Sequence, residues 1–259
     1  MSTSNTVQAG KVDVTKDEQG IATITFFHPH HNSLPGAVLN DLANTITKVG
    51  EDAQVKVVVL QSEGDRTFCA GASFDELLAI ENKEQGLTFF SGFAKVINAC
   101  RKSPKIILGR VQGKAVGGGV GVAAATDYCF ATKHAAVKLS ELAIGIGPFV
   151  VGPAVERKIG LSAFSQLSLD AGEFRSAAWA KEKGLYAAVF ETTEELDAAV
   201  QAFAAKLATY NPEALQAMKQ VFWEGTEHWD QLLVERAGIS GTLVLSDFTR
   251  NFIKQFKNK

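Results

Sequence analysis

The chain has 259 residues, of which 46% are hydrophobic and 21% charged, a balance typical of globular proteins and unlike disordered, collagen-like or coiled-coil sequences. A formal net charge of −2 provides no broad basic surface, so we expect neither a nucleic-acid partner nor attachment to an acidic membrane. The three cysteines have no CxxC spacing, which predicts neither a disulfide framework nor a zinc site and favours a reducing, cytoplasmic environment.

Neither the start of the chain nor its longest apolar run indicates export or membrane insertion. Residues 1–10, MSTSNTVQAG, are small and polar and lack the apolar centre of a secretory signal, so we expect a mobile N-terminus. The longest nearly apolar run, residues 142–155, contains three glycines and two prolines and is shorter than the roughly 18 residues that span a bilayer.

The first half of the chain alternates predicted strands and helices. Residues 11–27 alternate polar and apolar side chains on either side of Gly20, which predicts a β-hairpin. Ser73 and Glu76 fit the S-x-x-E capping box, in which each side chain accepts a hydrogen bond from the backbone of the other, so a helix is expected to begin at about Ser73. The other expected elements are a helix at 37–49, a strand buried on both faces at 55–60, a helix at 87–102, and strands at 105–112, 128–132 and 135–140.

From residue 149 the pattern becomes helical, with one strand-like segment at 186–191. An α/β core at 11–195 followed by a helical C-terminal region at 196–259 is therefore expected. The predicted helices occupy 150–160, 161–172, 176–185, 194–210, 212–225 and 229–245.

Glycine is the strongest local signal. Five of the 23 glycines fall within residues 113–121, between a predicted strand and a predicted helix. Such a turn allows a close approach of the backbone, and free N–H groups at a helix start stabilise negative charge. The run fits neither the P-loop nor the dinucleotide fingerprint. An oxyanion or phosphate cradle and a merely tight turn both remain open.

Another glycine turn, at residues 69–73 (CAGAS), also leads into a predicted helix. It comes earlier in the chain and is therefore the first turn, and the run at 113–121 is the second. Two such turns can direct two N–H groups at one oxygen atom. The pair is more informative than either turn alone.

The two turns resemble the signatures of the crotonase (enoyl-CoA hydratase/isomerase) superfamily. TFCAGASFDEL at 67–77 is similar to the first signature, and residues 111–132 running into 135–152 are similar to the second. HNSL at 31–34 and the stretch at 174–190 extend the resemblance over roughly residues 11–255. The resemblance implies an α/β fold, a spiral of β-β-α units with a C-terminal helical trimerisation region. It also implies an acyl-CoA thioester substrate, no cofactor apart from the coenzyme A of the substrate, no metal, and a homotrimer or a dimer of trimers.

Residue by residue, the resemblance assigns an oxyanion hole to the backbone N–H groups of Ala72 and Gly118. Two fixed donors there would stabilise the enolate oxygen that forms when a base removes a proton next to the thioester carbonyl. The resemblance also suggests substrate or coenzyme A contacts, with the basic C-terminal tail near the phosphates. The residues concerned are Asn32, Ser33, Leu34, Ala70, Gly71, Gly117, Gly121 and Phe252.

The catalytic base is where the sequence departs from the hydratase pattern. Similar hydratases carry two glutamates, but here the first position is Gly121 and only the second, Glu141, is a carboxylate. One glutamate can move a proton between two carbons, whereas adding water needs a further group. An isomerase-like activity is therefore favoured, and Gly121→Glu is expected to raise any hydratase activity. The alternatives are an enoyl-CoA hydratase of fatty-acid or branched-chain metabolism, a decarboxylase or thioesterase variant, and a non-catalytic CoA-ester binding protein.

Other side chains near the motifs have simpler explanations. Asp75 and Glu76 lie at the start of a helix, where capping explains them. Cys69 has no basic neighbour to activate it, and packing is favoured. Three phenylalanines, Phe89, Phe90 and Phe93, form an apolar face that is favoured as core, with a role in an acyl pocket as the alternative.

Overall fold

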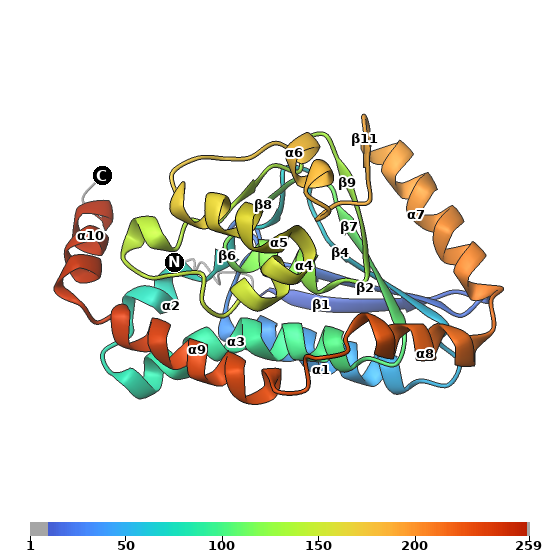
Figure 1. Cartoon of the computed structure of the whole chain (residues 1–259), viewed down its shortest axis with the longest axis horizontal. Helices are drawn as coiled ribbons and strands as arrows, with labels where there is room; N and C mark the ends of the chain where they lie inside the picture. Colours follow the sequence, from blue (N-terminus) through green and yellow to red (C-terminus); the bar gives the residue numbers. More distant parts are fainter. Residues whose placement is uncertain (1–9, 258–259) are drawn as a thin grey trace, which may run out of the picture.

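A large sheet of six strands forms the centre of the molecule, in the order β1-β2-β4-β7-β9-β11 (Figure 1). The computed structural model describes residues 10–257, so the expected mobile segment at 1–10 lies, apart from Gly10, outside the described residues. β1 is antiparallel to β2 in the predicted hairpin, and the other neighbours are parallel. The strands are β1 (Lys11–Lys16), β2 (Ile21–Phe27), β4 (Val57–Ser62), β7 (Ile106–Val111), β9 (Tyr128–Thr132) and β11 (Ala188–Phe190).

Two small parallel sheets lie beside the large one, in the orders β10-β8-β5 and β3-β6. Successive units place one strand in the large sheet and the next in a small sheet before a helix follows: β4 and β5 precede α3, β7 and β8 precede α4, and β9 and β10 precede α5. The β-β-α repeat expected from the resemblance is thus present. The short strands are β3 (Ser33–Leu34), β5 (Thr67–Cys69), β6 (Gly71–Ala72), β8 (Lys114–Val116) and β10 (Val137–Lys138).

Helices enclose the sheets and make up most of the second half of the chain. In Figure 1, α1, α3 and α9 lie along one side of the molecule, and α10 lies at the opposite end from α7 and β11. The helices are α1 (Gly36–Glu51), α2 (Phe74–Leu78), α3 (Lys83–Lys102), α4 (Gly118–Ala125), α5 (Gly152–Leu169), α6 (Ala177–Glu182), α7 (Thr193–Ala208), α8 (Pro212–Phe222), α9 (Trp229–Leu243) and α10 (Asp247–Lys257), with a 3-10 turn η1 (Leu142–Ile144).

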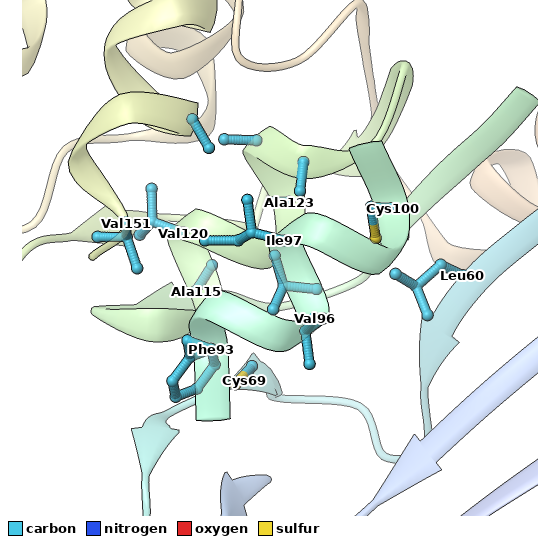
Figure 2. Packing of buried hydrophobic residues seen from close by; sticks show 14 of the residues in the cluster. Leu60, Cys69, Phe93, Val96, Ile97, Cys100, Ala115, Val120, Ala123 and Val151 are labelled. Atoms are coloured by element: carbon cyan, nitrogen blue, oxygen red, sulfur yellow. The ribbon is translucent and has the colours of Figure 1, made fainter. Parts of the chain in front are cut away.

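The central strands of the large sheet are buried on both faces, as predicted for the β-branched segment at 55–60, whereas the edge strand β1 is largely exposed. Val57 and Val59 pack with α7 in one apolar cluster, whereas Val58 and Leu60 belong to the main cluster with α1 and α3. The alternation follows from the two-residue period of a strand. The main cluster continues to α4, whose Val120 and Ala123 lie near Ile97 of α3 (Figure 2).

Helix α8 is fastened to the core by a buried ion pair. Lys219 Nζ lies 2.6 Å from Asp127 Oδ2, and both side chains are 2% exposed. The Asp127 carboxylate also accepts hydrogen bonds from Trp223 Nε1 at 2.8 Å and from the Ile107 backbone N–H at 2.8 Å. A fully hydrogen-bonded carboxylate of this kind holds the C-terminal helices to the junction of α4 and β9.

The predicted capping box is only half formed. Ser73 Oγ accepts from the Glu76 N–H, as expected, but the Ser73 N–H donates to Leu34 O. The Glu76 carboxylate instead accepts a hydrogen bond from the Gly36 N–H at 2.8 Å and so caps the start of α1. The reciprocal bond predicted for Glu76 is therefore wrong, because β3 occupies the Ser73 N–H first.

Several predicted boundaries also change. The strand expected at 135–140 is confined to Val137–Lys138, and the last predicted helix ends at Leu243. A further helix, α10, follows it inside the expected helical region at 196–259, although no separate helix is predicted there. Across residues 10–257, no helix is both long and apolar enough to cross a membrane.

Candidate active site

The two glycine turns meet. Gly71 has a φ of +94°, and a Cβ placed on it would lie 3.8 Å from the Gly118 N and 3.3 Å from the Val116 O. Gly118 is the first residue of α4, where N–H groups have no acceptor within their own helix. The backbones of β6 and of the α4 N-terminus therefore lie against each other, and the convergence of two N–H groups on one oxygen atom stays a prediction.

Glycine is required at this junction because neighbours fill the space where side chains would stand. Gly117 has a φ of +53°, and a Cβ there would lie 3.0 Å from Glu141 Oε1. A Cβ on Gly118 would overlap the Phe93 ring, and one on Gly119 would overlap the carbonyl oxygen of Cys69. The glycine run thus brings the start of α4 against both the first turn and the glutamate.

A cavity of about 350 Å³ opens beside the two turns. Ala70, Gly71, Ala72, Gly117 and Gly118 form part of its wall. Most of the remaining wall is apolar, and six phenylalanines contribute to it: Phe74, Phe89, Phe90, Phe93, Phe149 and Phe252. The phenylalanines at 89, 90 and 93, which the sequence favoured as core, line this cavity, although Phe93 is also buried in the core cluster.

Glu141 is the one acidic residue among the described residues that line this cavity. The residue as a whole is only half-buried, but Oε2 is inaccessible and has no hydrogen-bond partner. Burial raises the pKa of this carboxyl from 4.5 to about 7, partly opposed by a hydrogen bond from its own backbone N–H. A carboxylate in this state is a base matched to neutral pH.

A valine fills the space beside Gly121, where the resemblance to hydratases places the first of two glutamates. A Cβ on Gly121 would lie 2.5 Å from Cγ1 and 2.7 Å from Cβ of Val151. Val151 lines the cavity, whereas Gly121 lies behind it on the wholly buried helix α4. The sequence revealed the missing carboxylate, but not the side chain that occupies its place.

The residues of the HNSL segment support the first turn from behind and lie outside the cavity wall. The Asn32 side chain accepts from the His28 N–H and donates to the carbonyl oxygens of Glu63 and Thr67. Ser33 Oγ donates to Ala72 O at 2.8 Å, and Leu34 pairs with Ala72 between β3 and β6. Their predicted contacts with coenzyme A, and that of Gly121, stay predictions.

The other side chains considered as reactive groups, Asp75, Glu76 and Cys69, do not take part in the arrangement around Glu141. Neither Asp75 nor Glu76 lines the cavity, and the carboxylate of Glu76 caps α1. Burial raises the pKa of the Cys69 thiol to about 12, which leaves it protonated and unreactive. Within residues 10–257 no cluster of three or more His, Cys, Asp or Glu side chains is arranged to hold a metal ion.

Among the cavity residues that were not singled out from the sequence are Lys138, Phe149, Val151 and Ser240. The first three lie within ten residues of Glu141, so their nearness to the glutamate was a usable signal. Ser240 comes from α9, whose Gly241 packs directly on the backbone of Gly86 in α3. Nothing local in the sequence indicates that crossing.

Comparison with known proteins shows the family to which the chain belongs. A family model described as enoyl-CoA hydratase/isomerase matches residues 16–239. A probable enoyl-CoA hydratase of Bacillus subtilis is 27% identical over 207 residues, which are 80% of each chain. The solved structure of a putative enoyl-CoA hydratase from Mycobacterium avium paratuberculosis has a TM-score of 0.84 and 26% identity over 96% of both chains. Human mitochondrial delta3-delta2-enoyl-CoA isomerase, at 20% identity, shares the fold with a TM-score of 0.85 over 95% of this chain and 96% of its own.

The fold, the paired glycine turns and the carboxylate beside them define an acyl-CoA enzyme. The chain belongs to the enoyl-CoA hydratase/isomerase family.

Proposed function

We propose that this enzyme is an enoyl-CoA isomerase that moves a double bond from C3 to C2 of an acyl-CoA thioester. The observation that carries the proposal is the absence of a second carboxylate from the described cavity wall, where Val151 fills the space beside Gly121. Glu141 is left as the only acid in the described cavity wall. A single carboxylate suffices for proton transfer between two carbons.

In the proposed reaction, the thioester oxygen accepts hydrogen bonds from the backbone N–H groups of Ala72 and Gly118. The Glu141 carboxylate removes a proton from C2, and the C–H electron pair forms a C1–C2 double bond while the carbonyl oxygen becomes an enolate. When the carbonyl re-forms, the C1–C2 pair becomes the C2–C3 double bond, and the former C3–C4 pair takes the proton from Glu141 at C4. No water enters, and the donors act most strongly on the enolate.

The apolar wall around Glu141 supports this role. Burial raises the pKa of the carboxyl to about 7, so it is a stronger base than an exposed glutamate and can still return its proton. The phenylalanines of the cavity exclude water from the enolate, which strengthens the hydrogen bonds made to it.

The second candidate is hydration of a 2-enoyl-CoA. It is favoured by the relatives, since the Bacillus subtilis protein is named a probable enoyl-CoA hydratase and the Mycobacterium avium paratuberculosis protein a putative one. Hydration would need a group other than a second glutamate to hold the water. Of the polar side chains in the cavity wall, Ser140 and Ser240 are the neutral ones.

An isotope experiment separates the two reactions. The enzyme is incubated with 3-enoyl-CoA and 2-enoyl-CoA in water enriched in ¹⁸O, and the products are resolved by mass. We expect the 3-enoyl ester to yield the 2-enoyl ester at unchanged mass, and ²H₂O to label it at carbon. Rapid uptake of ¹⁸O without double-bond migration would establish hydration instead.

A further inference from the structure

Lys138 is the one cationic residue in the described wall of the active-site cavity. Its backbone lies beside the second glycine turn, because Lys138 pairs with Val116 between β10 and β8 and its carbonyl accepts the Gly117 N–H at 2.8 Å. Its ammonium group donates to the Gly172 carbonyl at 3.2 Å, and Gly172 lines the same cavity. The positive charge of Lys138 therefore lies at the cavity wall, on the side where Gly117 and Gly172 also line the cavity.

A second lysine reinforces this charge. Lys138 Nζ lies 4.8 Å and Lys114 Nζ 5.0 Å from the centroid of the Phe174 ring, so two ammonium groups share one aromatic side chain. Neither lysine forms an ion pair with any carboxylate of residues 10–257. Two neighbouring positive charges without a counter-ion repel each other, and an anion bound between them or beside them relieves that repulsion.

We propose that Lys138 binds a carboxylate at the far end of the acyl group, so that the preferred substrates are CoA esters of unsaturated dicarboxylic acids. The inference deepens the proposed function and rests on it for the site of the thioester. Lys114 assists from the neighbouring strand by raising the local positive potential. The otherwise apolar cavity accommodates the carbon chain between the two carboxyl ends.

The phosphates of coenzyme A are the other anions that a lysine at this cavity could bind. The Lys138 carbonyl accepts the Gly117 N–H at 2.8 Å, so the Lys138 side chain begins next to the turn proposed to hold the thioester. The pantetheine arm separates the phosphates from the thioester by many more bonds than a six-carbon acyl chain contains. The short distance favours the acyl carboxylate.

Binding of unreactive esters tests the inference without any turnover. Adipyl-CoA and hexanoyl-CoA have the same chain length and differ in a terminal carboxylate. By titration calorimetry, we expect wild-type enzyme to bind adipyl-CoA about ten-fold or more tightly than hexanoyl-CoA, as a charge-assisted hydrogen bond predicts. Lys138→Met should bring this ratio close to one, and Lys138→Arg should retain most of it.

Controls separate binding of the acyl carboxylate by Lys138 from binding of the coenzyme A phosphates and from a general effect of losing a lysine. Lys48→Met, which removes an exposed lysine on α1 outside this cavity, should leave the ratio unchanged. N-acetylcysteamine thioesters of adipate and hexanoate lack phosphates and should show the same dependence on Lys138. The inference is overturned if Lys138→Met and Lys138→Gln, both folded by circular dichroism, keep the wild-type ratio. It is also overturned if they weaken both CoA esters equally and have no effect on the short thioesters.

The same measurements distinguish the two proposals. A ratio that depends on Lys138 in an enzyme that does not isomerise 3-enoyl esters would support the carboxylate site and contradict the isomerase activity. Isomerisation of 3-hexenoyl-CoA with no preference for the dicarboxylic ester would support the activity and contradict the carboxylate site.

Discussion

Glu141 combines two properties that the rest of the fold enforces. Its Oε2 atom is buried without a hydrogen-bond partner, and Gly117 leaves room for its carboxylate beside the first turn of α4. A carboxylate oxygen buried in an apolar wall without a hydrogen-bond partner is unfavourable for folding, and its retention there is typical of a group used in chemistry.

Replacing Glu141 with glutamine should abolish turnover. We expect kcat to fall by about 10³-fold or more, because general acid–base catalysis is lost. Binding of a saturated CoA ester should persist, since glutamine has nearly the same shape. Steady-state kinetics and calorimetry on the same preparation test both statements, and a variant that turns over at the wild-type rate would remove Glu141 from the mechanism.

The raised pKa of Glu141 predicts two opposite pH dependences. Activity should rise with pH up to about 7 and level off above it, because the base must be ionised. Stability should fall as pH rises from 4.5 through about 7, since the folded state holds the proton more tightly than the unfolded state. Urea unfolding at pH 5 and pH 8 should show this loss in wild-type enzyme but not in Glu141→Gln, with an upper bound of about 3 kcal/mol.

Some roles at the residue scale follow from sequence and others do not. The glycine turns and Glu141 were recognisable because each rests on a local motif. The second function of Glu76, capping α1, was not recognisable. Its carboxylate accepts a hydrogen bond from the N–H of Gly36, which lies 40 residues earlier in the chain. The cation at Lys138 became visible only when β10 was placed beside β8.

Helix α4 is buried along its whole length, and this limits what can be added to it. The sequence alone suggested that Gly121→Glu would favour hydration, but Val151 stands where the new side chain must begin. The helix and the segment that carries Val151 are therefore a packed pair, and a change in one requires a change in the other.

The double variant Gly121→Glu, Val151→Gly should gain hydratase activity that neither single variant has. Removing the whole Val151 side chain, Cβ included, makes room for a second carboxylate, which can then hold a water molecule opposite Glu141. Uptake of ¹⁸O by 2-enoyl-CoA measures the gain, and thermal unfolding should show Gly121→Glu alone to be the least stable of the three. Equal stability of the single and double variants would contradict the packing argument.

The ion pair between Lys219 and Asp127 should determine how firmly α8 is held. Lys219→Met leaves a buried carboxylate without its cation, and we expect the free energy of unfolding to fall by about 3 kcal/mol or more. Adding Asp127→Asn should recover part of this loss, because an amide needs no counter-ion. Urea titration followed by tryptophan fluorescence reports on Trp223 at the same site. A loss below 1 kcal/mol would indicate that the pair is dispensable.

At the scale of the molecule, the active site is completed by the end of the chain. Phe252 of α10 lines the cavity, and Phe248 and Thr249 lie against Gly145 in the loop that follows η1. Sequence patterning predicted β10, the strands of the large sheet and most helices, since each has its own period, but it missed the short strands β3, β5, β6 and β8. The pattern did not reveal α10 as a separate helix, because few of its residues are buried and its hydrophobic periodicity is therefore weak evidence.

Ending the chain after Ser246 should leave a folded enzyme with a weakened site. We expect a higher KM for long acyl-CoA esters, because the cavity loses the Phe252 wall, and a smaller effect on butenoyl-CoA. Circular dichroism checks the fold, and kinetics across chain lengths check the effect. An equal change in KM for every chain length would contradict a role of Phe252 in the acyl pocket.

The resemblance also predicts a homotrimer or a dimer of trimers, which the single chain does not test. Large apolar side chains remain exposed on α5 and α8, among them Leu161, Leu169 and Val221. Covering them in an assembly would remove apolar surface from water. Light scattering should give three or six times the chain mass of 27.7 kDa, and a monomer at micromolar concentration would contradict the prediction.

The three cysteines allow local opening of this enzyme to be timed. Cys69, Cys100 and Cys129 are all buried, and burial raises the pKa of each thiol to about 12, so none reacts with an alkylating reagent in the closed structure. Cys69 begins the glycine turn at 69–73, Cys100 lies on α3 and Cys129 on β9. Labelling rates, resolved by peptide mass, would therefore show whether the turns around the active site open before the sheet does.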